Sequence, residues 1–206
     1  MMIYDITPPI TASLAVWPGD TPLSREVLCD MRKGANITLS TLRATAHLGA
    51  HADAPCHYGV DAASIEQRSL DYYLGRCQVI DVDVPRKWRI GVADVHCEVR
   101  TPRVLLSTRS FPDPTVFSED FAALSAELID HLHDRGVCLV GIDTPSVDLF
   151  ESADLPAHKQ ILQHDMAILE GLVLRDVPEA EYELIALPLR LVDFDASPVR
   201  AVLRTL

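Results

Sequence analysis

Short apolar runs, each bounded by turn-forming or charged residues, set the tightest limit on how this chain can fold. Three of them, residues 76–84, 103–108 and 137–144, are rich in Val, Ile and Leu and have the length of strands rather than of helices. They therefore predict buried strands. Further strands are predicted by apolar or β-branched runs at residues 2–6, 37–46, 166–174, 182–191 and 199–206.

Helices are predicted at a few places between these strands. The clearest begins at Ser125, a good N-cap residue, and ends at Gly136. A second helix is predicted over residues 155–164, and a short one over residues 69–75, ended by its glycine. Many strands with helices between them indicate the α/β class, with a mixed sheet and antiparallel pairing near the C-terminal end.

Composition limits the organisation and the partners of the chain. Its 206 residues, with no internal repeat or polar linker, predict a single domain over residues 1–206. The net charge of −12 disfavours nucleic acid and anionic membranes as partners. We expect no transmembrane helix, because no apolar run reaches about 18 residues, and no signal peptide, because the first residues lack a basic segment.

The cysteines argue against a disulfide framework. There are five, an odd number, and no C-x-x-C pair occurs among them. A zinc–cysteine site is disfavoured for the same reason. Reduced thiols in a cytoplasmic protein are therefore expected.

The segment HLGAHADAPCH, residues 47–57, carries the strongest functional signal. It gathers His47, His51, Asp53 and His57, and the small residues between them let the backbone approach an ion. Imidazole and carboxylate together suit zinc, manganese or a similar divalent ion. An isolated histidine is more often a half-buried hydrogen-bonding residue, but this cluster is too dense for that explanation, so we predict a metal site.

Remote ligands are expected to complete such a site. His158 follows a proline at the start of a predicted helix, and Glu170 interrupts the apolar run of residues 166–174. A carboxylate buried in a strand is costly unless it is paired or binds metal. The alternative is that Glu170 faces solvent from a half-exposed strand.

The histidine segment resembles the H-x-G-T-H-x-D-x-P-x-H signature of the metal-dependent cyclase family, and within that family the chain is similar to the kynurenine formamidases, or arylformamidases. Two positions depart from the usual pattern: Ala50 stands where the wider family has Thr, and Cys56 where a larger apolar residue is usual. Neither is a proposed ligand. The similar motifs run nearly end to end and are residues 17–22, 47–58, 141–148, 155–158, 165–174, 182–191 and 195–203.

The resemblance implies a role for individual residues. His47, His51 and Asp53 would hold one zinc ion, and Asp53 would bridge to a second zinc ion. The second ion would be completed by His158 and Glu170, which gives two Zn²⁺ per subunit, with Mn²⁺ or another divalent ion also possible. His57 would be the catalytic acid/base and Trp17 would line the substrate pocket. The implied fold is the swivelling β/β/α fold of the family, usually as a homodimer.

The implied reaction is hydrolysis of N-formyl-L-kynurenine to L-kynurenine and formate, a step of tryptophan degradation through kynurenine. Metal coordination lowers the pKa of water by several units, so a metal-activated hydroxide would attack the formyl carbon. His57 would take the proton of the water and pass it to the aniline nitrogen. A cramped pocket would favour formyl over larger acyl groups.

Three alternatives remain at this stage. The first is a related metal-dependent hydrolase that acts on isatin-like cyclic amides, with the same metal segment and a different pocket. The second is a non-catalytic metal-binding protein, which would need no unligated His57. The third is a cysteine hydrolase that uses Cys56, although a buried structural thiol is the commoner role for such a residue.

Overall fold

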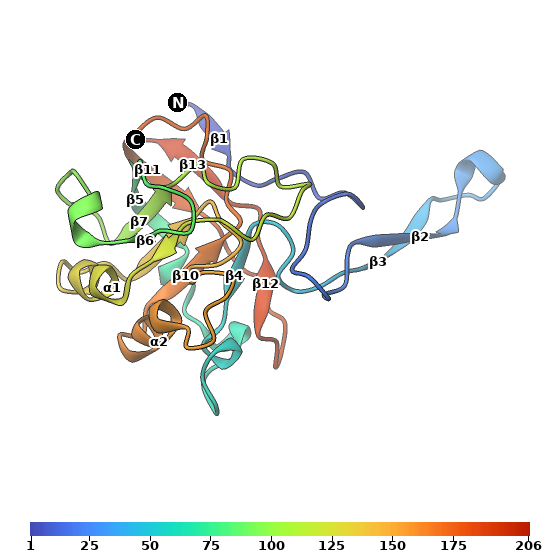
Figure 1. Cartoon of the computed structure of the whole chain (residues 1–206). Coiled ribbons are helices and arrows are strands. Elements are labelled where there is room, and N and C mark those ends of the chain that lie inside the picture. The colour runs from blue at the N-terminus through green and yellow to red at the C-terminus, as the bar shows by residue number, and fades with distance from the viewer.

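A nine-stranded mixed sheet organises the computed structural model, which describes residues 1–206 (Figure 1). The strand order is β1-β13-β11-β5-β7-β9-β10-β4-β12, and the central strands β5, β7, β9 and β10 run parallel to one another. All other neighbours in this sheet are antiparallel. The strands are β1 (Ile3–Asp5), β4 (His51–Asp53), β5 (Leu74–Asp81), β7 (Arg103–Ser107), β9 (Leu139–Ile142), β10 (Ala167–Glu170), β11 (Ala180–Ile185), β12 (Ala196–Pro198) and β13 (Val202–Thr205).

This sheet confirms the predicted α/β class, the mixed pairing and the antiparallel C-terminal strands. Alternate residues of its strands enter two separate apolar clusters. Leu105 and Leu169 belong to a cluster on one face, whereas their neighbours Leu106 and Ile168 belong to a cluster on the other. Side chains alternate across a strand, so each central strand is buried on both sides.

Helices α1 (Ala126–His133) and α2 (Pro156–Gln163) cover one of these faces, side by side (Figure 1). The first begins as predicted: the Ser125 hydroxyl accepts a hydrogen bond from the Leu128 N–H at 3.1 Å. Leu128, Ile129 and Ile161 pack into the cluster beneath the helices. Neither helix combines the length and apolar character needed to cross a bilayer.

A two-stranded hairpin projects from the body of the molecule (Figure 1). It consists of β2 (Ser24–Cys29) and β3 (Leu39–Arg43), and several of its apolar side chains, among them Leu28 and Leu42, are exposed. A separate short parallel pair joins β6 (Arg89–Ile90) to β8 (Ala123–Leu124). Single 3₁₀ turns occupy Met31–Lys33, Pro55–His57, Ile65–Gln67, Leu70–Tyr72 and Val92–Asp94.

The helix predicted over residues 69–75 is wrong. Only Leu70–Tyr72 form one 3₁₀ turn, and Gly75 lies inside β5. Buried Arg103 explains the difference, because its guanidinium donates to the carbonyls of Asp71 and Tyr72, the latter at 2.6 Å from Nε. These carbonyls are the acceptors that a longer helix would have used.

Candidate metal centre

Sheet register brings His51, Asp53 and Glu170 together. β4 and β10 are antiparallel neighbours in which Glu170 lies opposite His51 and Ile168 lies opposite Asp53. His51 and Asp53 are two residues apart on one strand, so their side chains leave the same face of the sheet. All three side chains are buried, with 3% or less of each residue exposed. The prediction that Glu170 is a buried strand carboxylate agrees with this geometry, and its solvent-facing alternative does not.

The turn that follows Glu170 also depends on close backbone approach. β10 ends there because Gly171 has φ +65°, and a Cβ at this position would lie 2.2 Å from the carbonyl oxygen of Gly49. Gly49 itself has φ +61°. Two glycines in left-handed conformations therefore let the histidine segment contact the strand that carries Glu170.

His158 reaches the same cluster from the first turn of α2. Its Nδ1 lies 2.9 Å from Oδ2 of Asp148, and its backbone N–H donates to the same oxygen at 3.1 Å. Donation from Nδ1 leaves the lone pair on Nε2, which lies 3.6 Å from Asp53 and 3.7 Å from Glu170. Asp148 also accepts from Arg89 at 2.6 Å. Asp148 therefore orients the proposed ligand His158 but is not itself a proposed ligand.

The ligand atoms form two groups that share Asp53. One group contains His47, His51 and Asp53, the other contains Asp53, His158 and Glu170, and within each group the atoms lie within 4.8 Å of one another. Asp53 Oδ1 lies 3.1 Å from His47 Nδ1 and 3.3 Å from His51 Nε2. This arrangement matches the two ligand sets that the resemblance implies.

Polar atoms in the cluster are left without hydrogen bonds. His51 Nε2 and both carboxylate oxygens of Asp53 are buried, yet none has a hydrogen-bond partner within the protein. A buried polar atom left in this state costs about 1–3 kcal/mol. A divalent cation would satisfy all three atoms, because nitrogen and carboxylate oxygen are its preferred donors. The residues present therefore fit a divalent metal ion.

The charges of the cluster also favour the binding of a cation. Burial lowers the pKa of His51, but the nearby carboxylates of Asp53 and Glu170 outweigh burial and raise this pKa to about 10. Burial likewise lowers the pKa of His158, and Asp148 and Asp53 raise it to about 10. The pKa of Asp53 falls well below its usual value, because its three histidine neighbours outweigh burial. The carboxylates thus draw positive charge into the site.

A cavity of about 520 Å³ opens beside these ligands. Its wall includes the proposed ligands His47, His51, His158 and Glu170, and also Trp17 and His57. The indole of Trp17 lies 5.5 Å from the ring of Phe117 and 4.9 Å from that of Phe150, measured between centroids. Such a volume is typical of small-molecule sites.

Asp143, Pro145 and Ser146 also line this cavity. Burial raises the pKa of Asp143 despite hydrogen bonds from Thr108 and Arg109. Its carboxylate accepts the Thr108 N–H at 3.0 Å and the Arg109 N–H at 2.8 Å, which fixes the neighbouring loop. The role of Asp148 behind His158 was not predicted, although the motif that contains it was singled out.

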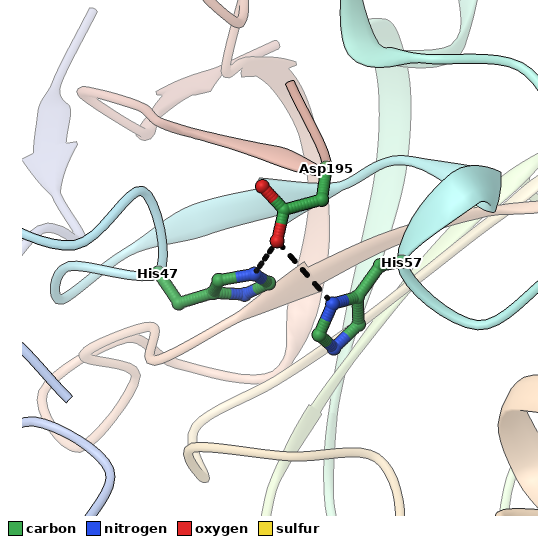
Figure 2. Close-up of side chains that lie close together, drawn as sticks. All are labelled: His47, His57 and Asp195. Atoms are coloured by element: carbon green, nitrogen blue, oxygen red, sulfur yellow. Dashed lines mark hydrogen bonds and ion pairs between the residues drawn. The ribbon is translucent and has the colours of Figure 1, made fainter. Parts of the chain in front are cut away.

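Asp195 is the other residue that sequence analysis missed. Its carboxylate lies between the rings of His47 and His57, 3.0 Å from His47 Nε2 and 3.6 Å from His57 Nδ1 (Figure 2). The signal that could have found it is its place at the start of the motif over residues 195–203.

Comparisons with known proteins agree with this fold. The chain matches the model of the family described as "Putative cyclase" over residues 4–149. Two solved structures are each 28% identical in sequence to this chain. One is a "Potential Metal-Dependent Hydrolase With Cyclase Activity", with a TM-score of 0.85 over 98% of this chain and 96% of that one. The other is a "predicted metal-dependent hydrolase from Bacillus stearothermophilus", with a TM-score of 0.83 over 98% of this chain and 97% of that one. Isatin hydrolase A from Labrenzia aggregata shares the fold at 20% identity, with a TM-score of 0.85 over 100% of this chain and 94% of that one.

The chain therefore has the fold of these metal-dependent hydrolases, and its groups of His, Asp and Glu are able to hold a divalent ion. More narrowly, the chain belongs to the cyclase family, whose model covers well over half of its length.

Proposed function

We propose that this protein is a zinc-dependent arylformamidase that hydrolyses N-formyl-L-kynurenine to L-kynurenine and formate, in tryptophan degradation. The observation that carries the proposal is the placement of His57 in the cavity wall beside two ligand groups that share Asp53. His57 belongs to neither of these two groups, so it remains available for proton transfer. The motifs that resemble kynurenine formamidases support this choice of substrate.

The metal would be held by the residues already described. His47, His51 and Asp53 would bind one Zn²⁺, and Asp53, His158 and Glu170 a second. Bound there, such ions supply Lewis acidity, which makes water more acidic and polarises an acyl oxygen. The two carboxylates offset the positive charge of the ions in a buried site.

The protein's own residues move the protons. Nε2 of His57 is the ring nitrogen that points away from Asp195 (Figure 2), and it would accept a proton from the attacking water. The same nitrogen would then return the proton to the aniline nitrogen as the C–N bond breaks. Glu170 is fixed in place for its role as a ligand, because its Oε1 accepts the Val147 N–H at 2.7 Å.

The cavity wall would recognise an aromatic substrate that carries a carboxylate. Trp17 is held by the edges and faces of Phe117 and Phe150 and would pack on the aryl ring. Arg175 also lines the cavity, and its guanidinium donates to the neutral carbonyl of Pro112. Its charge acts on nearby Asp113 but forms no salt bridge, so the guanidinium would attract the α-carboxylate of the substrate.

A second candidate is hydrolysis of isatin-like cyclic amides. The fold shared with isatin hydrolases and the aromatic cavity wall both accommodate a bicyclic aryl amide. These structures share only 16–20% of the sequence, and an isatin has no carboxylate for Arg175 to bind. The formamide is therefore the better substrate on this geometry.

The experiment is hydrolysis of N-formyl-L-kynurenine by the purified protein, followed by formate release. The rate should vanish after chelation and return when zinc is restored. N-acetyl-L-kynurenine and isatin serve as comparison substrates, and the formyl compound should be preferred over both. Preference for isatin would overturn the choice of substrate, and a rate that survives complete, measured metal removal would overturn the metal-dependent chemistry and favour Cys56.

We further propose that the protein is a single domain and acts as a cytoplasmic homodimer. The hairpin of β2 and β3 supports the dimer, because an isolated two-stranded sheet is marginal on its own and this one exposes Leu28, Met31 and Leu42 by 54%, 62% and 69%. Light scattering should give twice the chain mass for the wild type, and Leu42→Asp should shift the mass toward the monomer. A wild-type monomer at micromolar concentration would contradict the proposal.

A further inference from the structure

Asp195 occupies a position that is fixed by the strand carrying two of the proposed ligands. It directly precedes β12, in which Ala196 pairs with Asp53 of β4. Its own carbonyl accepts the Ala54 N–H at 2.8 Å, which continues the pairing by one residue. The backbone of Asp195 is therefore held against the end of β4.

One carboxylate oxygen of Asp195 faces two histidine rings. Oδ2 accepts a hydrogen bond from His47 Nε2 at 3.0 Å and lies 3.6 Å from His57 Nδ1 (Figure 2). The second distance is about 0.4 Å beyond a hydrogen bond, which a small ring rotation would close. The two rings lie 4.3 Å apart between centroids. Asp195 itself is absent from the cavity wall, and its side chain is 50% exposed to solvent.

These contacts select one tautomer for each ring. A neutral imidazole has one N–H and one lone pair. Donation from Nε2 of His47 leaves the lone pair on Nδ1, the nitrogen that lies 3.1 Å from Asp53 within the first ligand group. An N–H on Nδ1 of His57, facing Asp195, leaves the lone pair on Nε2, the nitrogen that proton transfer requires.

The same three side chains are also close enough to hold a metal ion, since their ligand atoms lie within 4.8 Å of one another. However, His47 would then need a lone pair on both ring nitrogens, one for each ion. This requires the imidazolate anion, in which neither nitrogen carries a proton. Orientation by hydrogen bonding is therefore the chemically simpler role for Asp195.

We infer that Asp195 is a positioning residue that orients, through one oxygen, both the metal ligand His47 and the acid/base His57. The half of the inference that concerns His57 rests on the proposed reaction, whereas the half that concerns His47 rests only on the proposed metal site. Asp195 thus couples the orientation of the His47 ring to the orientation of the His57 ring. A change at this single residue should therefore affect metal affinity and turnover together.

The test compares Asp195→Ala and Asp195→Asn with the wild type. With zinc saturating, kcat for Asp195→Ala should fall about 10–100-fold while KM changes less than about threefold, because Asp195 does not line the cavity. Added acetate should restore kcat severalfold, since the exposed side of Asp195 leaves a path for a small carboxylate. Acetate should not restore His57→Ala. Asp193→Asn, which removes a charge from the same exposed loop, is the matched control and should behave as wild type.

Zinc affinity, measured by competition with a chromophoric chelator, is the readout that needs no turnover. Asp195→Ala should bind zinc about 10–100-fold more weakly than wild type and Asp193→Asn. Wild-type kcat and zinc affinity in Asp195→Ala would overturn the inference. The inference would also be overturned if activity fell only in proportion to the loss of folded protein and acetate did not restore it. A further bound ion that is present in the wild type and absent from Asp195→Ala would overturn it as well. If the wild type fails to hydrolyse the formamide, the proposed function fails, and zinc affinity still decides the role of Asp195 toward His47.

Discussion

Replacing Asp53 with Asn tests whether one carboxylate serves both ligand groups. The substitution keeps the size of the side chain and removes one negative charge. Asp53 lies 3.1 Å from His47, 3.3 Å from His51 and 3.6 Å from His158, and only 1% of it is exposed. No other side chain is common to the two metal-binding groups that contain it, so both ions should be weakened.

The size of the effect follows from burial. Removing one partner of a buried charge pair costs about 3–5 kcal/mol, and each 1.4 kcal/mol is a factor of about ten in affinity. Each zinc ion should therefore bind Asp53→Asn at least about 100-fold more weakly. Zinc at 100 times the wild-type Kd stabilises the folded state by about 2.7 kcal/mol per site, which for a chain of this length raises Tm by about 5–11 °C.

The assay is thermal unfolding with and without zinc, combined with metal analysis after gel filtration. The wild type should show the rise in Tm and two ions per chain, and Asp53→Asn should show neither. Glu170→Gln is the contrasting variant, because its ligand oxygen belongs to one group only. Two retained ions in Asp53→Asn, or loss of a single ion, would refute the bridging role.

Four further outcomes are expected. His57→Ala should keep both ions by metal analysis and lose about 10²–10⁴-fold in kcat; loss of zinc instead would make His57 a ligand. Glu170→Gln should lose one ion and keep its fold by circular dichroism, since Gln can still accept the hydrogen bond described for Oε1; unchanged metal content and rate would remove Glu170 from the site. Gly171→Ala should lower unfolding free energy by at least about 2 kcal/mol in urea, because of its positive φ and the 2.2 Å approach to Gly49; wild-type stability would contradict this packing. Arg175→Gln should raise KM for N-formyl-L-kynurenine and leave KM for formanilide, which has no carboxylate, unchanged; equal effects on both would argue against a carboxylate contact.

The parts of the site that sequence predicts are those whose chemistry is local. One short segment contains His47, His51 and Asp53. Glu170 can be recognised because it lies inside an apolar run, where burying an unpaired carboxylate would be costly. Asp148 and Asp195 carry no such signal, because each contacts a histidine rather than an ion and each lies in a loop of ordinary composition.

The fold shows the same division. The central strands are predictable, because burial on both faces demands continuous apolar runs. β4 is not predictable in this way: His, Ala and Asp have low strand propensity, and its neighbours β10 and β12 impose the extended conformation. The false helix at residues 69–75 has a similar origin, since the long-range hydrogen bonds of Arg103 override local preference there.

The sheet order also decides when the metal centre can be completed. β4 lies between β10 and β12, so the strand with His51 and Asp53 gains its two neighbours only from residues 167–170 and 196–198. A growing chain would therefore carry the histidine segment unpaired until residues 167–170 have been made. The full ligand set therefore cannot assemble before residue 170 has been made, and a product truncated before that residue would retain the histidine motif without the second ligand group.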